Sequence, residues 1–447
     1  MPGIPGGEDA RGGEAAEGHS HDEAELAPGA QTSWGAQGLL CQALGRENMA
    51  RAWRRVKANR GSAGVDGRTV QDTHEYLKLA WPQIRQGLLD GSYRPQPVRR
   101  VGIPKPDGGT RELGIPTVVD RLIQQALLQV LQPLLEPTFS EHSYGFRPGR
   151  SAQQAVKVAQ QYVEAGYAVV VDVDLEKFFD RVNHDIVMER MARRIVDKPV
   201  LSLIRRYLQA GVLTSGVRWE REEGTPQGGP LSPLLANVML DEVDRELERR
   251  GHRFVRYADD CNVYVRSHKA GERVLEALRR CYAKLRLKVN EGKTAVAEVW
   301  DRKFLGYALL KRSSGTVHLK IAEQSLQKLR HRIREMTRVT IGKSLEQVAD
   351  DLRGFIPGWR AYFALAQAPS VFIELDGWLR TRLRVLRLRQ WRHGPKIYRE
   401  MRVLGASESL AQRVASLTAG WWGSARTGLK FILTVSYFDN LGVPKFS

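Results

Sequence analysis

The stretch FVRYADDCNVYV, residues 254–265, holds two adjacent aspartates, Asp259 and Asp260, between two runs of aromatic and β-branched residues. Such runs on both sides of a short polar turn predict a β-hairpin with the two carboxylates at its tip. A second apolar run, YAVVVDV over residues 167–173, predicts a buried strand and is followed directly by Asp174. If these strands pair in one sheet, the three carboxylates meet at one edge of it.

Three carboxylates in one place point to a bound cation, because neighbouring negative charges repel one another until a cation neutralises them. Hard divalent ions prefer oxygen ligands, and Mg²⁺ is favoured where phosphates also bind. Two such ions about 3.5–4 Å apart can activate an attacking 3′-hydroxyl and stabilise a leaving pyrophosphate. The aspartate pair of YADD alone is equally typical of a plain polar turn, so the cation site depends on the neighbouring motifs.

The chain is long and strongly basic. It has 447 residues, with 69 Lys and Arg against 50 Asp and Glu, so its formal net charge is +19. That length exceeds what one hydrophobic core usually supports and predicts two or more domains. The charge is uneven, since residues 1–30 hold seven acids against one Arg, whereas residues 311–447 hold 24 basic and 10 acidic side chains. A polyanion is the natural partner of such a chain, and a basic surface kept for solubility is the alternative.

Several classes of protein are excluded by the sequence. The three cysteines, Cys41, Cys261 and Cys281, form no CxxC pair, so a disulfide scaffold and a Cys-rich zinc module are excluded and a reducing cytosol fits. No apolar run approaches the roughly 18 residues that a membrane span needs, so we expect no membrane partner. The first residues lack the basic-then-apolar order of a signal peptide.

Strands alternate with helices in the middle of the chain, and a helical, basic end follows. This order predicts an α+β fold and then an all-α region. The stretch GSAGVDG, residues 61–67, breaks the helical N-terminal part, and residues 93–116 predict two short strands around a Gly-rich turn. Residues 122–134 and a segment starting near Ala152 have the apolar spacing of helices.

Further motifs follow one another in a fixed order. They are IPKPDGGTRELGIP (103–116), SYGFRPGRS (143–151), DVDLEKFFD (172–180), TPQGGPLSPLLAN (225–237), RYADD (256–260), LKVNEGKT (287–294) and FLGY (304–307). Together they resemble the motifs of the group II intron-encoded reverse transcriptases and maturases, most of all the compact bacterial class C type. The segments GFIPGWRAYF (354–363) and GWLRTRLRVLRLRQW (377–391) resemble the maturase-specific thumb, which binds intron RNA in that family.

The resemblance implies a right-hand polymerase, with fingers and palm built from an antiparallel sheet and helices, followed by an all-α thumb and a basic C-terminal region. The expected parts are a disordered acidic tail (1–33), an N-terminal helical extension (34–83), fingers and palm (84–309), a thumb or maturase-specific region (310–400) and a basic nucleic-acid-binding region (401–447). No CxxC follows residue 310, so the endonuclease domain of many relatives is not expected.

The resemblance also assigns the catalytic site, with two Mg²⁺ ions as cofactor. The catalytic and metal-ligand positions are those of Asp174, Asp259 and Asp260, with the backbone carbonyl of Leu175 as a further ligand. Asp174 is preferred to Asp172 because the aromatic residue five positions on is then Phe179, at the position whose ring excludes a ribose 2′-hydroxyl. Phe178 and Phe179 could both be core residues, but the alternation of side chains along a strand favours Phe179 as the gate.

Other residues match positions that bind the incoming deoxynucleoside triphosphate. Besides Phe179 they are Lys105, Arg111, Gln227, Gly228 and Lys293. Arginine offers phosphate a bidentate fork and lysine a point charge, and glycine lets a loop backbone approach the nascent base pair. Lys293 matches the lysine that assists the departure of pyrophosphate. Without the palm motifs, these cations would be ordinary surface residues.

Two basic segments are expected to bind nucleic acid. The candidate residues are Arg147, Arg150, Arg380, Arg384, Arg387 and Trp391. The first two lie in the loop before the helix that is expected to contact the template. The three later arginines recur at i, i+4 and i+7 beside a tryptophan, a combination that suits backbone tracking with base stacking. An amphipathic surface helix with solvated arginines is the alternative.

These assignments imply an RNA-directed DNA polymerase that uses an RNA template, expected to be its parent intron RNA, with a DNA primer or target and dNTPs. A role as maturase in splicing and mobility follows from the resemblance alone. We expect the protein in the bacterial cytoplasm, at the nucleoid when it acts on DNA, and its oligomeric state is not predicted. The alternatives are a reverse transcriptase domesticated for DNA repair or phage defence, and an RNA-binding splicing factor without polymerase activity.

Overall fold

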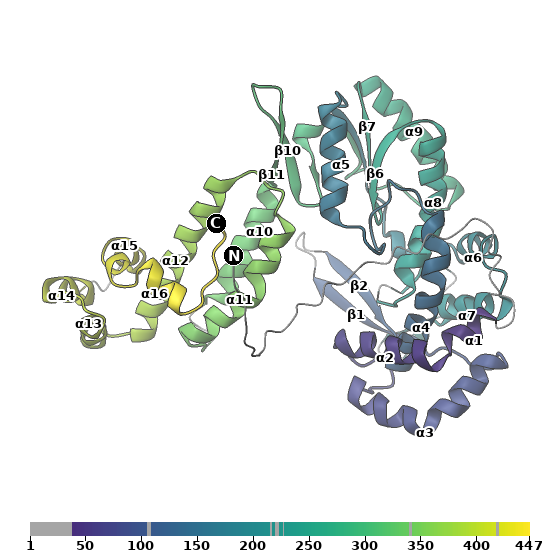
Figure 1. Ribbon diagram of the computed structural model, residues 1–447, viewed down its shortest axis with the longest axis horizontal. Helices are drawn as coiled ribbons and strands as arrows, with labels where there is room; N and C mark the ends of the chain where they lie inside the picture. The colour runs from purple at the N-terminus through teal and green to yellow at the C-terminus, as the bar shows by residue number, and fades with distance from the viewer. Residues whose placement is uncertain are drawn as a thin grey trace, which may run out of the picture. The chain divides into compact units, whose positions relative to one another are not determined.

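Figure 1 shows the computed structural model, whose described helices and strands belong to the unit from Leu39 to Ser447. The residues that it describes are 38–104, 109–214, 217–219, 223–226, 228–338, 342–416 and 420–447. The acidic tail expected over residues 1–33 lies outside them. Within these ranges the strands form three sheets, and none of the helices is both long and apolar enough to cross a lipid bilayer.

Three helices open the unit. They are α1 (Leu39–Ala43), α2 (Arg46–Ala58) and α3 (Val70–Leu89). Helix α3 begins at a capping box, in which the Thr69 hydroxyl accepts from the amide of Asp72 and the Asp72 carboxylate accepts from the amide of Thr69. Because α3 continues to Leu89, the boundary predicted between residues 83 and 84 falls inside a helix.

A four-stranded sheet with the order β2-β1-β4-β5 follows these helices. Its strands are β1 (Val98–Pro104), β2 (Thr110–Ile115), β4 (Val212–Thr214) and β5 (Val217–Trp219). Strands β1 and β2 pair antiparallel, with Ile103 opposite Arg111. The two-stranded hairpin predicted over residues 93–116 is therefore confirmed.

The central sheet has the order β6-β7-β3-β8 and is antiparallel throughout. Its strands are β3 (Val169–Val173), β6 (Arg253–Tyr257), β7 (Asp260–Val265) and β8 (Ala295–Glu298). Helix α5 (Ala152–Glu164) packs on one face, and helices α8 (Ser232–Arg249) and α9 (His268–Lys284) pack on the other (Figure 1).

Both faces of the central sheet are buried. Because side chains alternate between the faces, Val171 and Val263 join the core with α8 and α9, whereas Val170 and Tyr264 join the core with α5. Burial on both sides explains why residues 167–173 read as an almost unbroken apolar run.

Three more helices complete the core that α8 and α9 share with the central sheet. They are α4 (Val118–Leu135), α6 (His184–Ala192) and α7 (Lys198–Gln209). Helix α4 shows the predicted apolar spacing, since Ile123, Leu127 and Leu131 are buried on one face. Helix α8 begins at Ser232, near the end of the Pro- and Gly-rich stretch 225–233, as the sequence predicts.

The C-terminal part starts with strands and continues with helices. A three-stranded sheet joins β9 (Lys303–Phe304), β10 (Tyr307–Lys311) and β11 (Val317–Ile321). The helices after it are α10 (Glu323–Met336), α11 (Leu345–Tyr362), α12 (Pro369–Trp391), α13 (Gly394–Val403), α14 (Glu408–Ser416), α15 (Trp421–Thr427) and α16 (Val435–Asn440). The helical region thus begins several residues later than the predicted boundary at 309, which lies inside β10.

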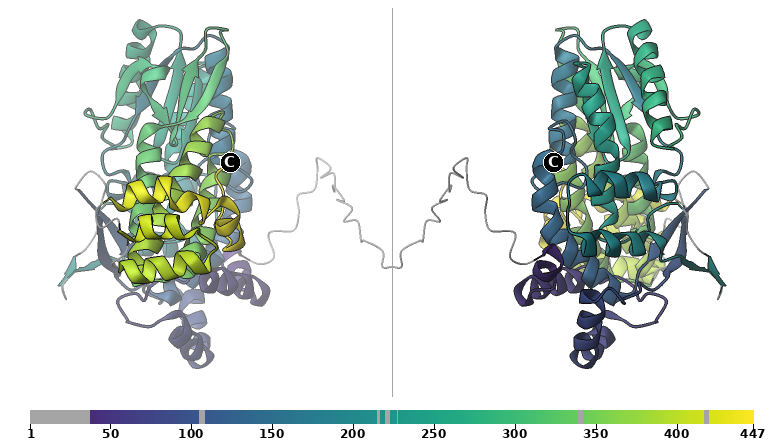
Figure 2. Two further views of the ribbon diagram at one scale, coloured as in Figure 1. Left: turned by 90° about the vertical axis from the view of Figure 1, so that its left-hand side faces the viewer. Right: turned by 90° about the vertical axis from the view of Figure 1, so that its right-hand side faces the viewer.

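Helix α12 is buried around most of its circumference. Its buried residues include Leu379 and Leu383 but also Arg384, and it shares one core with Phe438 and Phe446 from the end of the chain. The left panel of Figure 2 looks onto α12 and the helices after it, which are drawn in yellow-green to yellow. The alternative of an amphipathic surface helix with solvated arginines does not describe α12, because segments after the helix bond to Arg384 and Arg387.

Candidate active site

Strand register brings the three predicted aspartates to one end of the central sheet. Val173, the last residue of β3, pairs with Cys261 of β7, and Asp260 is the first residue of β7. Asp174 follows directly after Val173 and so leaves the sheet beside Asp260, next to the turn that carries Asp259. The predicted strand and hairpin are confirmed, and the carboxylates meet at one edge as expected.

The charges at this edge act strongly on Asp260. The pKa of Asp260 is raised to about 7, first by partial burial and then by the carboxylates of Asp259, Asp172 and Asp174, whereas Lys293 lowers it. Asp260 is nevertheless an exposed residue, and screening by solvent weakens such effects. Since like charges add to the effect of burial, a divalent cation bound here would relieve the repulsion among them.

Asp172 and Asp174 lie two residues apart but have different partners. The guanidinium of Arg302 donates to Asp172 Oδ2, with Nε at 2.9 Å. Asp174 Oδ2 instead accepts from Asn290 Nδ2 at 3.0 Å and lies 3.9 Å from Lys293 Nζ. Arg302 already pairs with Asp172, whereas Asp174 has a neutral amide and the more distant Lys293 near its carboxylate. The roles predicted for Asp174 and Lys293 stay predictions.

The oxygen atoms at this edge are the ligand type that a hard cation prefers. The bridge between Leu175 and Val289 uses the carbonyl of Asp174 and the amide of Glu176, so it does not occupy the carbonyl of Leu175. Across the described part of the chain, no three His, Cys, Asp or Glu side chains lie close enough to form a ready-made metal cluster. The donor set fits Mg²⁺ in chemistry, and Asp174 keeps carboxylate lone pairs for an ion beside the bond that Oδ2 accepts from Asn290.

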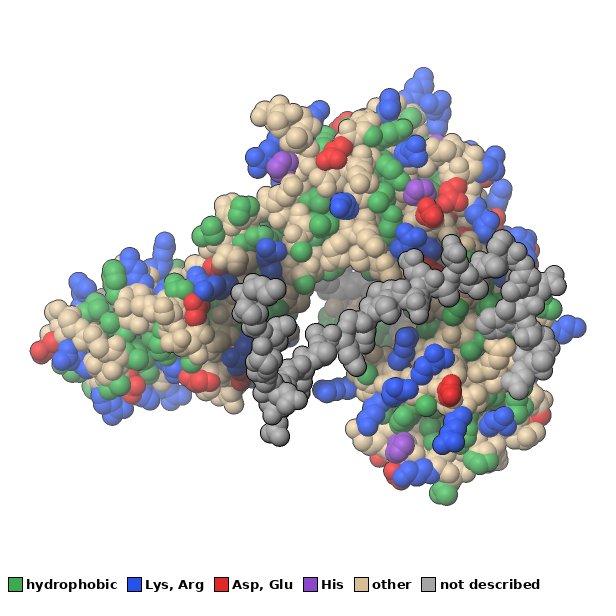
Figure 3. Space-filling view, viewed as in Figure 1, with side chains coloured by type: hydrophobic (Ala, Val, Ile, Leu, Met, Phe, Trp, Pro, Cys, Tyr) green, Lys and Arg blue, Asp and Glu red, His purple; other side chains and the backbone are tan. Residues whose placement is uncertain are grey.

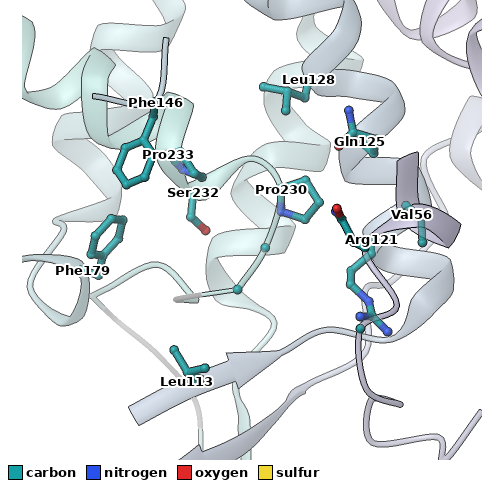
Figure 4. A pocket seen from close by; sticks show the side chains of 14 residues that line it. Val56, Leu113, Arg121, Gln125, Leu128, Phe146, Phe179, Pro230, Ser232 and Pro233 are labelled. Atoms are coloured by element: carbon teal, nitrogen blue, oxygen red, sulfur yellow. The ribbon is translucent and has the colours of Figure 1, made fainter. Parts of the chain in front are cut away.

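A cavity of about 520 Å³ opens next to Phe179 (Figure 4). The lining residues shown in Figure 4 include Phe146, Leu113, Arg121, Gln125 and Pro230. Phe178 and Phe179 lie in a 3₁₀ helix, Phe178–Asp180, so the strand alternation used to choose between them does not apply. Both rings belong to the buried core, with Phe178 2 % and Phe179 8 % exposed, but only Phe179 lines the cavity.

The loop that precedes α8 comes very close to the hairpin of β1 and β2. Gly228 has φ +149°, and a Cβ atom there would lie 2.7 Å from the carbonyl oxygen of Gly114 in β2. The position therefore requires glycine because the loop packs against β2. The approach of Gly228 to the nascent base pair stays a prediction. Lys105 and Gln227 lie outside the described residues, and Arg111 is described only by its backbone in β2.

Some residues at the site were missed by the sequence reasoning. Arg121 lines the cavity and donates from Nη2 to the carbonyl of Ser62 at 2.6 Å, which ties the Gly-rich stretch 61–67 to α4. Arg256 donates to the carbonyl of Ala258, next to Asp259, and Arg302 donates to the carboxylate of Asp172. In the sequence, each of these arginines appears only as a single charge next to apolar residues. That pattern does not show which group the arginine binds.

Two family models match the chain. Residues 103–309 match the family described as reverse transcriptase (RNA-dependent DNA polymerase), and residues 326–404 match the group II intron, maturase-specific domain. Protein YkfC of Escherichia coli (strain K12) is 34% identical over 310 residues, which cover 60% of this chain and 81% of that protein. The chain belongs to the group II intron-type reverse transcriptases.

Other relatives are longer than this reverse transcriptase. The group II intron-encoded protein LtrA of Lactococcus lactis subsp. cremoris is 30% identical over 333 residues, covering 60% of this chain and 55% of LtrA, so the chain spans about half the length of LtrA. A solved chain of the partial Cas6-RT-Cas1--Cas2 complex is 26% identical, covers 56% of this chain and 43% of that one, and has a TM-score of 0.37. Reverse transcriptases as a family use Mg²⁺.

The loop 143–151 of this reverse transcriptase keeps Arg147 inside it. The side chain of Arg147 is 4 % exposed, with Nε 2.8 Å from Glu136 Oε1 and Nη1 donating to the carbonyl of Ser143 at 2.8 Å. This burial contradicts the predicted contact of Arg147 with nucleic acid, because Glu136, Ser140 and Ser143 already hold the guanidinium.

Three residues predicted to bind nucleic acid from α12 are also engaged within the protein. Arg384 is buried and donates to the carbonyl of Leu433 at 2.9 Å. Arg387 pairs with Glu346 at 2.9 Å, and Trp391 is 6 % exposed in the same core. These predictions are corrected, since the side chains hold neighbouring segments rather than a free surface.

Two of the predicted nucleic-acid-binding arginines remain accessible. Arg150 is half-buried, with its guanidinium 5.5 Å from the ring centroid of Tyr144. Arg380 is half-buried on α12. Their contact with nucleic acid stays a prediction.

Proposed function

We propose that the chain is an active RNA-directed DNA polymerase that adds deoxynucleotides to a DNA 3′-hydroxyl on an RNA template. The observation that supports it most is the meeting of Asp174, Asp259 and Asp260 at one edge of the central sheet, with a pKa of about 7 for Asp260. These carboxylates and the carbonyl of Leu175 are proposed to hold two Mg²⁺ ions. When bound, the ions make the 3′-hydroxyl more acidic and neutralise the departing pyrophosphate.

The protein side chains are proposed to orient the incoming nucleotide. The ring of Phe179 in the cavity wall leaves no room for a ribose 2′-hydroxyl, so dNTPs are preferred to ribonucleotides. Lys293 is 58 % exposed and lies next to Asp174, where its ammonium group can pair with the leaving pyrophosphate and give it a proton. Lys105 and Arg111 are proposed to hold the triphosphate, and Gln227 to contact the nascent base pair.

We propose the parent intron RNA as the natural template and a maturase role in its splicing. The match of residues 326–404 to the maturase-specific domain supports this role. The net charge of +19 and the Lys and Arg side chains spread over the described surface in Figure 3 suit a polyanion. We propose that the reaction takes place in the bacterial cytoplasm, at the nucleoid, where the proposed DNA primer or target would lie.

The double substitution Asp259→Ala and Asp260→Ala tests the polymerase directly. It should abolish cDNA synthesis, because the ions lose two ligands, while the affinity for intron RNA stays within about threefold, since binding depends on basic surfaces. Primer extension and RNA binding are measured in parallel on wild type and variant. The matched control is Asp301→Ala, which removes an aspartate outside the carboxylate edge and should leave both properties unchanged.

The two halves of the proposal fail separately. Continued cDNA synthesis by the folded double variant would show that the catalytic site lies elsewhere. Loss of RNA binding together with cDNA synthesis, at an unchanged melting temperature, would show that the two functions share this site. Splicing of the parent intron in the presence of the double variant completes the measurement, because a maturase role needs no cDNA.

A further inference from the structure

The turn between β6 and β7 has an unfavourable backbone conformation. Tyr257 pairs with Asp260 across the hairpin, so Ala258 and Asp259 form the turn. Ala258 has φ +57°, in the left-handed region that residues with a Cβ rarely adopt. Such a conformation persists only when the surroundings fix it. Because Ala258 directly precedes Asp259 and Asp260, its backbone conformation orients both aspartates.

The side chain that fixes this turn is Arg256, which is fully buried. Its Nη1 donates to the carbonyl oxygen of Ala258 at 2.9 Å and to Asn237 Oδ1 at 3.0 Å. Its Nε and Nη2 donate to the two oxygens of Asp244, at 2.7 and 2.5 Å. Asp244 and Asn237 both belong to α8, so one guanidinium joins the turn to the helix beneath the sheet.

The opposite side of the turn is closed by the loop 143–151. Asn237 Nδ2 donates to the carbonyl of Gly145 at 2.9 Å. A Cβ atom on Gly145 would lie only 2.1 Å from the amide nitrogen of Ala258. The turn is therefore held between a backbone that admits only glycine and an arginine that holds its carbonyl.

A buried ion pair is a poor way to gain stability alone, because the desolvation of two charges offsets their attraction, and apolar residues of similar volume often replace such pairs without loss. Arg256 does what an apolar residue cannot: its fork serves Asp244, Asn237 and the Ala258 carbonyl at once. Resting on the proposed polymerase activity, we infer that Arg256 is a positioning residue for nucleotidyl transfer, which fixes the backbone of Asp259 and Asp260 through the carbonyl of Ala258.

The double variant Arg256→Met with Asp244→Leu separates this role from stability. Both charges leave together, so the fold should tolerate the change, but the Ala258 carbonyl loses its donor. We expect kcat for dNTP addition to fall about 10²-fold, the scale of a misplaced catalytic group, with the KM for dNTP within about threefold of wild type. Amide hydrogen exchange over residues 257–261 should accelerate, and Mn²⁺ binding, measured by electron paramagnetic resonance, should weaken.

A matched control comes from the same helix. Asp241 of α8 pairs with Arg194, and the contacts of this pair do not include the turn. The variant Arg194→Met with Asp241→Leu removes a second arginine–aspartate pair of α8, whose aspartate also pairs with Arg245. It should leave kcat, Mn²⁺ binding and exchange over residues 257–261 unchanged. In the conservative variant Arg256→Lys, the ammonium group can still pair with Asp244. It lacks the forked guanidinium needed to donate to the Ala258 carbonyl at the same time, so kcat should fall with little change in KM.

The outcomes decide the inference in each case. If the folded Arg256→Met/Asp244→Leu variant keeps the kcat, Mn²⁺ affinity and exchange rates of wild type, Arg256 only fills the core and the inference is overturned. If that variant does not fold, the same readouts on Arg256→Lys decide, and wild-type values there overturn it equally. If wild type itself makes no cDNA, the proposed function fails, and Mn²⁺ binding with hydrogen exchange still shows whether Arg256 holds the turn.

Discussion

Arg302 joins Asp172 to the backbone of Lys293. Its Nε and Nη2 donate to the same carboxylate oxygen of Asp172, at 2.9 and 2.5 Å, and Nη2 also donates to the carbonyl of Lys293 at 2.8 Å. One guanidinium thus neutralises the first aspartate of the DVD sequence and fixes the loop that places Lys293 beside Asp174. Asp172 therefore serves an internal ion pair, whereas Asp174 is the proposed cation ligand. Substitutions at the two positions can distinguish these roles.

Asn substitutions at the two positions should differ greatly in effect. Asp174→Asn removes a proposed cation ligand and should lower cDNA synthesis by about a thousandfold or more, the scale for a principal electrostatic group. Asp172→Asn leaves Arg302 a neutral acceptor and should keep activity within about tenfold, at a stability cost of about 1–2 kcal/mol. Primer extension and thermal melting of both variants test this. Equal losses of activity would mean that Asp172 is also a ligand.

The carboxylate edge predicts a pH dependence of stability in the absence of divalent ions. The pKa of Asp260 is raised from 3.8 to about 7, so between these values the folded state binds more protons than the unfolded state. Stability must then fall as pH rises through this window. In EDTA, the melting temperature of wild type relative to Asp260→Asn should decrease from about pH 5 to about pH 8. Adding Mg²⁺ should reduce the decrease, and parallel curves in EDTA would contradict the assignment.

Substitution of Phe179 should relax the choice of sugar. Phe179→Val opens space in the cavity wall, so the ratio of ribonucleotide to deoxynucleotide incorporation should rise by at least about tenfold, equivalent to about 1.4 kcal/mol of discrimination. The variant should also lose about 2 kcal/mol of stability, because the ring is 8 % exposed. Phe178→Val is the control, since it removes an equally buried ring that does not line the cavity. If only Phe178→Val shifts the ratio, the ring that excludes ribonucleotides is Phe178, and the assignment to Phe179 is contradicted.

Two arginines of α12 should separate stability from RNA binding. Arg384→Gln leaves the carbonyl of Leu433 without its charged donor and should cost about 1–3 kcal/mol of stability, with the salt dependence of RNA binding unchanged. Arg389 is exposed, so Arg389→Gln should lower the slope of log K against log salt by about 1 without affecting melting. Filter binding over a salt series and thermal melting check both. A flatter slope for Arg384→Gln would restore the predicted RNA contact.

The sequence alone determined the strands that build the site and the order in which they come. The strand before Asp174 and the hairpin around Asp259 and Asp260 are visible because their alternation, turn residues and apolar runs are local properties of the chain. The ordered motifs added the family and the assignment of Asp174. Local patterns also predicted the hairpin of residues 93–116 and the helix that starts at Ala152.

Only the tertiary structure decided which charged side chains are available. Arg302 finds Asp172 at a separation of 130 residues in sequence, and Arg384 finds the carbonyl of Leu433 at a separation of 49. An arginine in a basic stretch reads the same whether it faces solvent or a buried acceptor, because the periodicity of a helix shows which residues share a face and not what covers that face. The arginines of α12 therefore looked like an RNA-binding stripe until the segments packed against them were known.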